Sequence, residues 1–190
     1  LLAGIGGSVL FATRRGEGDE KNAQQYFTLS VFYGIALSVV AMICIGLFNE
    51  QLFRLFGADD ELLILARLYL KPIFFAIPCC VFSNILSAYL RNDNNPSLAT
   101  KAVIIGGIFN CFGDYFCVFV LDMGMQGAGL ATAIGQYIAI FIMLTHFLSK
   151  KNTLRLVRTT RVLQKIGKIS ITGFSTAIND LAMGIIGILF

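Results

Sequence analysis

Apolar and polar positions alternate in long blocks along this chain. Stretches of about twenty or more mostly apolar residues are separated by short polar segments. A core helix of a soluble protein rarely stays apolar for that length, whereas a helix that crosses a bilayer needs about 20 apolar residues. The pattern predicts an all-α fold, a polytopic transmembrane helical bundle, with long helices near residues 26–48, 62–90, 98–121 and 128–148.

Helix boundary signals fall between these blocks. Asp19 is placed to cap the helix that contains the first block, and Gly57 is placed to end it. The acidic run Asp59-Asp60-Glu61 suits the first turn of the next helix, and Pro96 suits the first turn of the one after. The glycine-rich segment 122–129, DMGMQGAG, predicts a short turn before the fourth block.

Charge is sparse and uneven. Charged residues make up 14% of the chain, against about 25% in soluble domains, and this excludes soluble-enzyme functions. Twelve of the fifteen Lys and Arg residues fall in segments 14–25, 91–101 and 149–168. By the positive-inside rule, these segments lie on the cytoplasmic side of a multi-pass protein in a cell membrane, of the prokaryotic plasma or inner membrane type. No nucleic-acid partner is expected.

The last basic segment has helical spacing. Its cations step by three and four residues and therefore fall on one side of a helix: Arg155, Arg158, Arg161, Lys165 and Lys168. Apolar side chains fall largely on another side. This pattern predicts an amphipathic helix that lies on the membrane surface and links two bundles.

The third apolar block carries one carboxylate, Asp114. Asn110 lies four residues before it and Gly106 four before that, so a helix places all three on one face, which Ala102 and Cys117 extend. A charged side chain at the centre of an apolar span costs about 2.5–3.5 kcal/mol on insertion scales. We interpret Asp114 as part of a functional site; the alternative is a structural aspartate capped by Asn110 or a neighbouring helix.

A second carboxylate, Asp180, lies in the span that begins at Ile169, on a small or polar face with Thr176. Two carboxylates on two helices fit a cation or proton relay, because protonation and cation binding compete for the same group. Tyr115, Phe116 and Tyr137 are candidates for lining a substrate cavity together with Thr176, although most aromatic side chains of such a chain face lipid or pack helices.

Catalytic and metal chemistry find little support. The five cysteines all fall inside apolar runs, none forms a CxxC pair, and the single histidine, His146, stands alone. No nucleophile with a base at motif spacing is visible. We therefore expect neither an enzyme nor a resident cofactor or metal.

Several segments together resemble the multidrug and toxic compound extrusion (MATE) transporters. The similar segments are GIGGSVLFATRRGEGDEKNA, LFRLFGADDELLILARLYL, LSAYLRNDNNPSLA, NCFGDYFCVFVLDMGMQGAGLATAIGQ and GFSTAINDLAMGI. Each segment alone is a weak signal, but their order and spacing hold across essentially all 190 residues.

The resemblance implies about half of a twelve-helix, two-bundle transporter, from late in helix two through helix seven. Residues 1–148 would form most of the N-terminal bundle (helices 2–6), residues 149–168 a cytoplasmic basic amphipathic linker, and residues 169–190 the start of the C-terminal bundle. The chain begins and ends inside apolar segments, so we expect a longer protein.

The family's activity is implied in the same way. Members exchange H⁺ or Na⁺ for cationic or amphipathic drugs by alternating access, and we expect a monomeric secondary active efflux transporter. By position, Asn110 and Asp114 would belong to the ion or proton site of the first bundle. Asp180 would belong to the second, where many members place a glutamate, so the coupling ion stays open.

Two alternatives come from other functions. A lipid or lipid-linked sugar flippase of the same superfamily would carry a more cationic central cavity than these spans provide. An intramembrane aspartyl protease also uses two aspartates, but its chemistry resembles Tyr-Asp and Gly-x-Gly-Asp motifs. Here Asp114 follows Cys-Phe-Gly and Asp180 follows Asn179, which argues against that reading.

Overall fold

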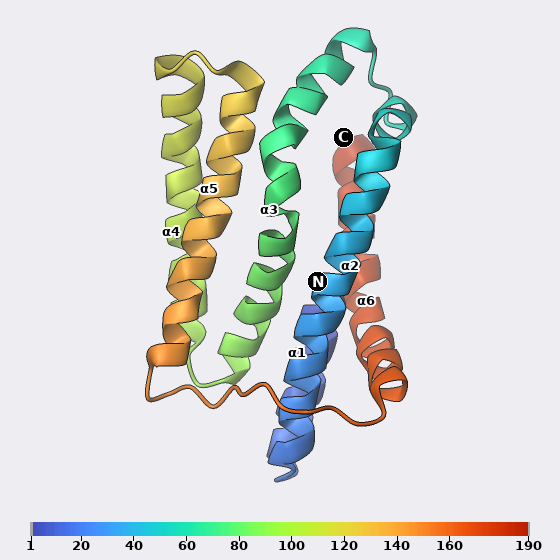
Figure 1. Cartoon of the computed structure of the whole chain (residues 1–190), viewed down its shortest axis with the longest axis vertical. Helices are drawn as coiled ribbons and strands as arrows, with labels where there is room; N and C mark the ends of the chain where they lie inside the picture. The colour runs from blue at the N-terminus through green and yellow to red at the C-terminus, as the bar shows by residue number, and fades with distance from the viewer. Residues whose placement is uncertain (1, 190) are drawn as a thin grey trace.

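The protein is a bundle of long helices joined by short loops (Figure 1). The computed structural model describes residues 2–189, with side chains described for residues 2–174, 178 and 182. The elements in chain order are α1 (Leu2–Gly16), α2 (Glu20–Leu55), α3 (Asp60–Asn92), α4 (Pro96–Tyr115), the π-helix η1 (Phe116–Val120), α5 (Gly124–Leu144), the 3₁₀-helix η2 (Thr145–Leu148) and α6 (Val162–Leu189). No strand occurs within residues 2–189, and the predicted all-α class is confirmed.

The four predicted spans are confirmed as helices. Each is long and apolar enough to cross a membrane, and they correspond to α2, α3, α4 with η1, and α5 with η2. The helices are longer than the apolar blocks: α2 continues to Leu55 with a break in helical backbone angles at Phe48. Pro72 and Pro78 both lie inside α3, which is assigned as one helix from Asp60 to Asn92.

Local signals set most helix ends. The Asp19 carboxylate accepts a hydrogen bond from the Asn22 amide at 3.2 Å and caps α2, and Asp59 caps α3 in the same way. Gly57 follows the end of α2 with φ of +86°, a conformation that favours glycine. The predicted turn over 122–129 is too long, because α5 already begins at Gly124.

The helices form two groups on either side of α3. Figure 1 shows α4 and α5 as a hairpin on one side and α1, α2 and α6 on the other. Helix α3 contacts α5 and α2, and α1 packs against both α2 and α6. The loops after α1, α3 and α5 lie at one end of the bundle (Figure 1); this end, which carries the basic segments, is called the basic end below.

The core is concentrated toward the basic end. Tyr89 is fully buried and makes edge contacts with Phe11 and Phe27, with ring centroids 5.4 and 5.0 Å apart. Its hydroxyl bonds the Ser30 hydroxyl at 2.8 Å and donates to the Tyr26 carbonyl at 3.1 Å. Three helices therefore meet around one aromatic ring whose polar end is satisfied.

The amphipathic helix predicted in the last basic segment is wrong for residues 155–161. This stretch is not helical and runs along the basic end (Figure 1), and helix α6 begins only at Val162. The backbone amides of Arg155, Val157 and Thr160 bond side chains of α2, namely Gln24, Thr28 and Gln25. Because buried polar groups on α2 supply the partners, the segment has no need of helical hydrogen bonds.

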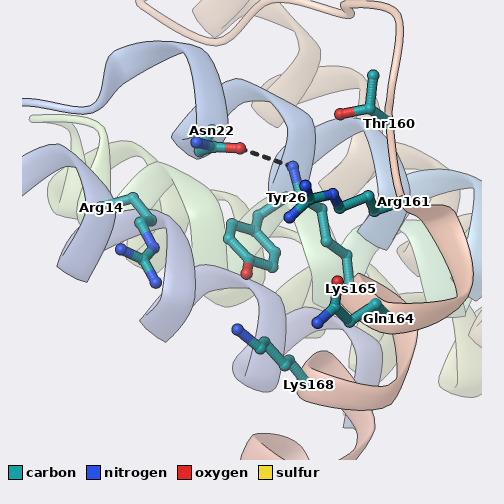
Figure 2. A pocket seen from close by; sticks show the side chains of 8 residues that line it. All are labelled: Arg14, Asn22, Tyr26, Thr160, Arg161, Gln164, Lys165 and Lys168. Carbon is teal, nitrogen blue, oxygen red and sulfur yellow. Dashed lines mark hydrogen bonds between the residues drawn. The ribbon is translucent and has the colours of Figure 1, made fainter.

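Lys165, predicted on the basic side of that helix, is buried in the structure. Its side chain is 9% exposed and its ammonium donates to the Asn22 carboxamide oxygen at 2.7 Å (Figure 2). The ammonium also bonds Gln25 and lies 5.5 Å from the centre of the Tyr26 ring. The start of α6 is thus held against the start of α2.

Candidate functional site

Small residues bring α4 and α5 into close contact. A Cβ atom placed on Gly106 would lie 2.7 Å from the carbonyl oxygen of Gly135, and the reverse distance is the same. Two turns further along α4, Gly113 faces Ala131 with a corresponding distance of 2.9 Å. Backbones approach this closely in membrane proteins only where side chains are absent or very small. The small and polar stripe predicted on α4 therefore packs against α5.

A polar contact joins α4 to α5 within this packing. The Asn110 carboxamide donates a hydrogen bond to the Thr132 hydroxyl at 3.1 Å, and that hydroxyl donates to the Ala128 carbonyl at 3.0 Å. Tyr69 of α3 brings its hydroxyl to 3.5 Å from the same Thr132 oxygen. Asn110 thus lies where three helices meet, and its own carboxamide oxygen takes no hydrogen bond from the described residues.

A small cavity of about 180 Å³ opens beside Asn110. Polar side chains from three helices line it: Ser83 of α3, Asn110 of α4, and Thr132 and Gln136 of α5. Sequence reasoning missed Ser83, Thr132 and Gln136. The i, i+4 spacing of Thr132 and Gln136 within an apolar span is the same signal that identified Asn110 and Asp114.

Asp114 lies one turn beyond Asn110 and is half-buried. Its Oδ1 atom is shielded from solvent and has no hydrogen-bond partner among the described residues. Most buried polar atoms in proteins are paired, so an orphaned carboxylate oxygen requires an explanation such as a proton or an ion. No hydrogen bond joins Asn110 to Asp114, and the Asn110 amide donates to Thr132.

The backbone changes helical type directly after Asp114. Helix α4 ends at Tyr115 and the next five residues, Phe116–Val120, form a π-helix. Short π-helical segments inside α-helices occur frequently at functional sites. The irregular turn therefore lies beside the carboxylate that the sequence singles out.

Three further predicted site residues, Tyr115, Phe116 and Tyr137, do not line the cavity beside Asn110. Tyr115 and Phe116 are 64% and 52% exposed on an apolar surface of α4 and η1, and Tyr137 donates its hydroxyl hydrogen to the Phe75 carbonyl of α3 at 3.2 Å. The cavity beside Asn110 is lined by other residues. The side chains of Thr176 and Asp180 lie outside the described residues.

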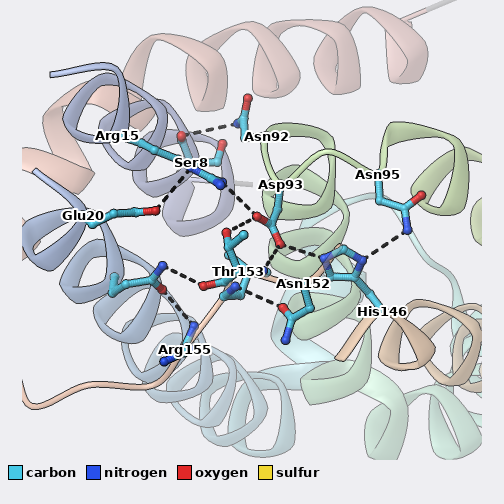
Figure 3. A network of polar contacts seen from close by, with 12 residues as sticks. Ser8, Arg15, Glu20, Asn92, Asp93, Asn95, His146, Asn152, Thr153 and Arg155 are labelled. Carbon is cyan, nitrogen blue, oxygen red and sulfur yellow. Dashed lines mark hydrogen bonds and ion pairs between the residues drawn. The ribbon is translucent and has the colours of Figure 1, made fainter. Parts of the chain in front are cut away.

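A different carboxylate, Asp93, forms the centre of a polar network at the basic end (Figure 3). It is fully buried and accepts hydrogen bonds from Arg15 at 2.9 Å, from His146 Nε2 at 2.7 Å, and from both the amide and the hydroxyl of Thr153. Asn95 donates to His146 Nδ1 at 3.2 Å, which leaves the Nε2 proton to point at Asp93. The network joins α1, the end of α3, η2 and the linker to α6.

Electrostatics favour the ionised form of Asp93. Burial by itself would raise the pKa of this carboxyl group, but the hydrogen bonds from His146, Thr153 and Arg15 outweigh burial and hold the pKa below its usual range. Sequence reasoning missed this centre and treated His146 as isolated. No local pattern could pair His146 with Asp93, because 53 residues separate them.

Comparison with known proteins gives a consistent family. The MatE family model matches residues 1–116. The multidrug export protein MepA of Staphylococcus saprophyticus is 28% identical over 98% of this chain, and MepA of Staphylococcus aureus is 25% identical over the same share. The chain spans about 42% of the length of either relative.

Solved transporter structures share the fold. An inward-facing multidrug resistance MATE family transporter superimposes with a TM-score of 0.89 at 23% identity, covering 97% of this chain and 42% of that one. An outward-facing MATE transporter gives 0.84 at 25% identity with the same coverage. Since the family model matches more than half of the chain, this chain belongs to the MatE (MATE) family.

Proposed function

We propose that this chain provides the ion-coupling half of a secondary active efflux transporter that exchanges H⁺ or Na⁺ for cationic or amphipathic substrates by alternating access. The orphaned, solvent-shielded Oδ1 atom of Asp114 is the single observation that carries the proposal. Family membership and the curated relatives named as multidrug export proteins support the substrate class.

Asp114 has the chemistry that coupling needs. An ionised carboxylate with an unpartnered oxygen in an apolar span is costly, and either a proton or a cation relieves that cost. The two cannot occupy the same oxygen together, so binding of one weakens binding of the other. Asp114 can therefore bind a proton or a cation on one side of the membrane and release it when the other binds on the opposite side.

Asn110 and its neighbours would complete the site. The Asn110 amide is fixed by Thr132, and its carboxamide oxygen lies free on the face that Asp114 shares. Carboxylate, amide and hydroxyl oxygens are the ligands that hard cations accept. The π-helical turn after Asp114 is the element we propose to rearrange when the occupancy of the site changes.

Membrane orientation follows from the charge distribution. The basic end holds twelve of the fifteen Lys and Arg residues, so we place it on the cytoplasmic side. Asp114 then lies toward the opposite end of its helix, because α4 begins at the basic end and Asp114 is the residue before the last in α4. The coupling site would accordingly lie closer to the external surface.

Reconstituted transport tests the proposal. The complete reading frame that encodes this chain is reconstituted in liposomes, and uptake or release of a cationic dye is followed under an imposed pH or Na⁺ gradient. Gradient-driven movement should occur in the wild type and disappear in Asp114→Asn. The ion whose gradient drives the dye identifies the coupling ion.

Glu61→Gln serves as the matched control, since Glu61 is an exposed carboxylate in the first turn of α3. It should transport like the wild type. Transport that survives in Asp114→Asn would make Asp114 structural. Absence of dye movement under both gradients in the wild type would instead favour a flippase.

A further inference from the structure

The basic end contains a cavity lined by four cationic side chains and by no carboxylate (Figure 2). It has a volume of about 430 Å³, many times the roughly 30 Å³ that one water occupies. Four of its eight lining residues are cations and none is a carboxylate. The cations are Arg14, Arg161, Lys165 and Lys168, and the neutral residues are Asn22, Tyr26, Thr160 and Gln164. This cavity is called the basic pocket below.

Three elements place the cations around one aromatic ring. Figure 2 shows Arg14, from α1, on one side of Tyr26, and the other three cations on the side of the linker and α6. Lys165 is held by Asn22 and Gln25, and Gln25 also accepts hydrogen bonds from the amide and hydroxyl of Thr160, each at 3.3 Å. The pocket wall is therefore fixed by contacts between α2 and the segment that leads into α6.

Most of the positive charge in the basic pocket is not neutralised. Arg14 pairs with Glu17 at 2.6 Å, but Arg161, Lys165 and Lys168 form no ion pair among the described residues. The nearby carboxylate Asp19 is occupied by both nitrogens of Asn22, at 2.6 and 3.2 Å. Side-chain donors of Arg161 and Lys168 bond none of the described residues.

The surroundings of Lys165 in the basic pocket disfavour its positive charge. Burial lowers the pKa of its ammonium group, and repulsion from Arg161, Arg14 and Lys168 lowers it further, while Asp19 opposes the change. These cations repel one another. An anion bound among them would attract each cation and offset the repulsion. The first turn of α6 adds backbone amides and contains no acidic residue.

We propose that the basic pocket binds a phosphate-bearing anion, through charge-assisted hydrogen bonds from Arg161 and Lys168 beside the buried Lys165. The planar Arg161 guanidinium suits the oxygens of a phosphate group, and the lysines supply point charges. Two sources carry this chemistry at a membrane surface: the headgroup of an acidic phospholipid and free inorganic phosphate. A bound anion would join α1, α2 and the start of α6.

Binding of a labelled lipid tests the proposal directly. The product of the complete reading frame is purified in neutral detergent, and binding of fluorescent phosphatidylglycerol is measured at fixed ionic strength. The double variant Arg161→Gln, Lys168→Gln should bind at least about tenfold more weakly, since each lost contact to a charged group weakens binding by roughly that factor. Lys150→Gln, Lys151→Gln removes the same charge from exposed linker positions outside the pocket and should bind like the wild type.

Competition then separates the two sources. Inorganic phosphate that displaces the labelled lipid identifies the phosphate group itself as the ligand, whereas displacement by unlabelled phosphatidylglycerol but not by phosphate identifies a lipid headgroup. Lys168→Gln alone, at an exposed position without described partners, provides a second variant that should fold normally and bind more weakly. Equal binding by wild type, pocket variants and control, or no binding of either probe, would overturn the proposal.

Discussion

Asp93 and Asp114 are both aspartates embedded in a helical bundle, yet their surroundings are opposite. Asp93 accepts four hydrogen bonds from three residues, whereas the Oδ1 atom of Asp114 is buried without any among the described residues. A carboxylate that accepts several hydrogen bonds, like Asp93, is held in its ionised form and joins the chain segments that donate them. An orphaned carboxylate gains from binding a proton or ion, so burial of charge alone does not distinguish structure from function.

The largest expected stability effect comes from removing the saturated carboxylate. Asp93→Ala leaves the buried His146 and the partly buried Arg15 without their partner and releases Thr153 of the linker. Breaking a buried ion pair on one side costs about 3–5 kcal/mol. The free energy of unfolding, measured in mixed micelles on the complete protein, should fall by that amount; a loss below about 1 kcal/mol would show that the network is not structural.

Close packing of α4 on α5 predicts a somewhat smaller effect. Gly135→Ala places a Cβ atom 2.7 Å from the Gly106 carbonyl oxygen, and the helices must separate. Overpacking of this kind costs about 1–3 kcal/mol, and the displaced Asn110 should also reduce ion-driven transport. Gly107→Ala is the matched control, since nothing lies within 4 Å of its added Cβ, and it should be neutral or stabilising by up to about 1 kcal/mol.

Acid titration sharpens the comparison at the basic end. The pKa of Asp93 is lower in the folded protein than its ordinary value, so the unfolded chain binds the proton more readily. The stability that Asp93 contributes is therefore complete above its unfolded pKa of about 3.9 and is lost as the pH falls through the lower folded pKa. Melting temperature measured between neutral and strongly acidic pH should fall more steeply in the wild type than in Asp93→Asn. Parallel curves would contradict the predicted linkage.

The smallest stability change is expected at Asp114. Asp114→Asn removes a charge whose Oδ1 atom has no partner, so the free energy of unfolding should rise or change by less than about 1 kcal/mol. Its transport should nevertheless be lost, and this separation of stability from activity is the sharpest form of the comparison. A destabilisation as large as that of Asp93→Ala would place Asp114 among the structural carboxylates.

Local signals in the sequence were sufficient for the helices and their ends. Long apolar blocks predicted the four spans, Asp19 predicted the cap of α2, and the acidic run 59–61 predicted the start of α3. The spacing of Asn110 and Asp114 predicted a shared helix face. These features depend on residues within one or two helical turns of each other. Their energetics are therefore readable without knowing the fold.

Tertiary contacts decided the features that join distant segments. The stretch 155–161 has the charge spacing of an amphipathic helix, but Gln24, Gln25 and Thr28 bond its backbone from more than 125 positions away and hold it non-helical. The Asp93 network and the basic pocket arise in the same way, from segments that meet only at the basic end of the bundle. Sequence by itself determined which segments cross the membrane and which helix face carries the carboxylate. Only the folded bundle decided which carboxylate is satisfied and which is left open, because hydrogen-bond partners are supplied by whichever segments packing brings together.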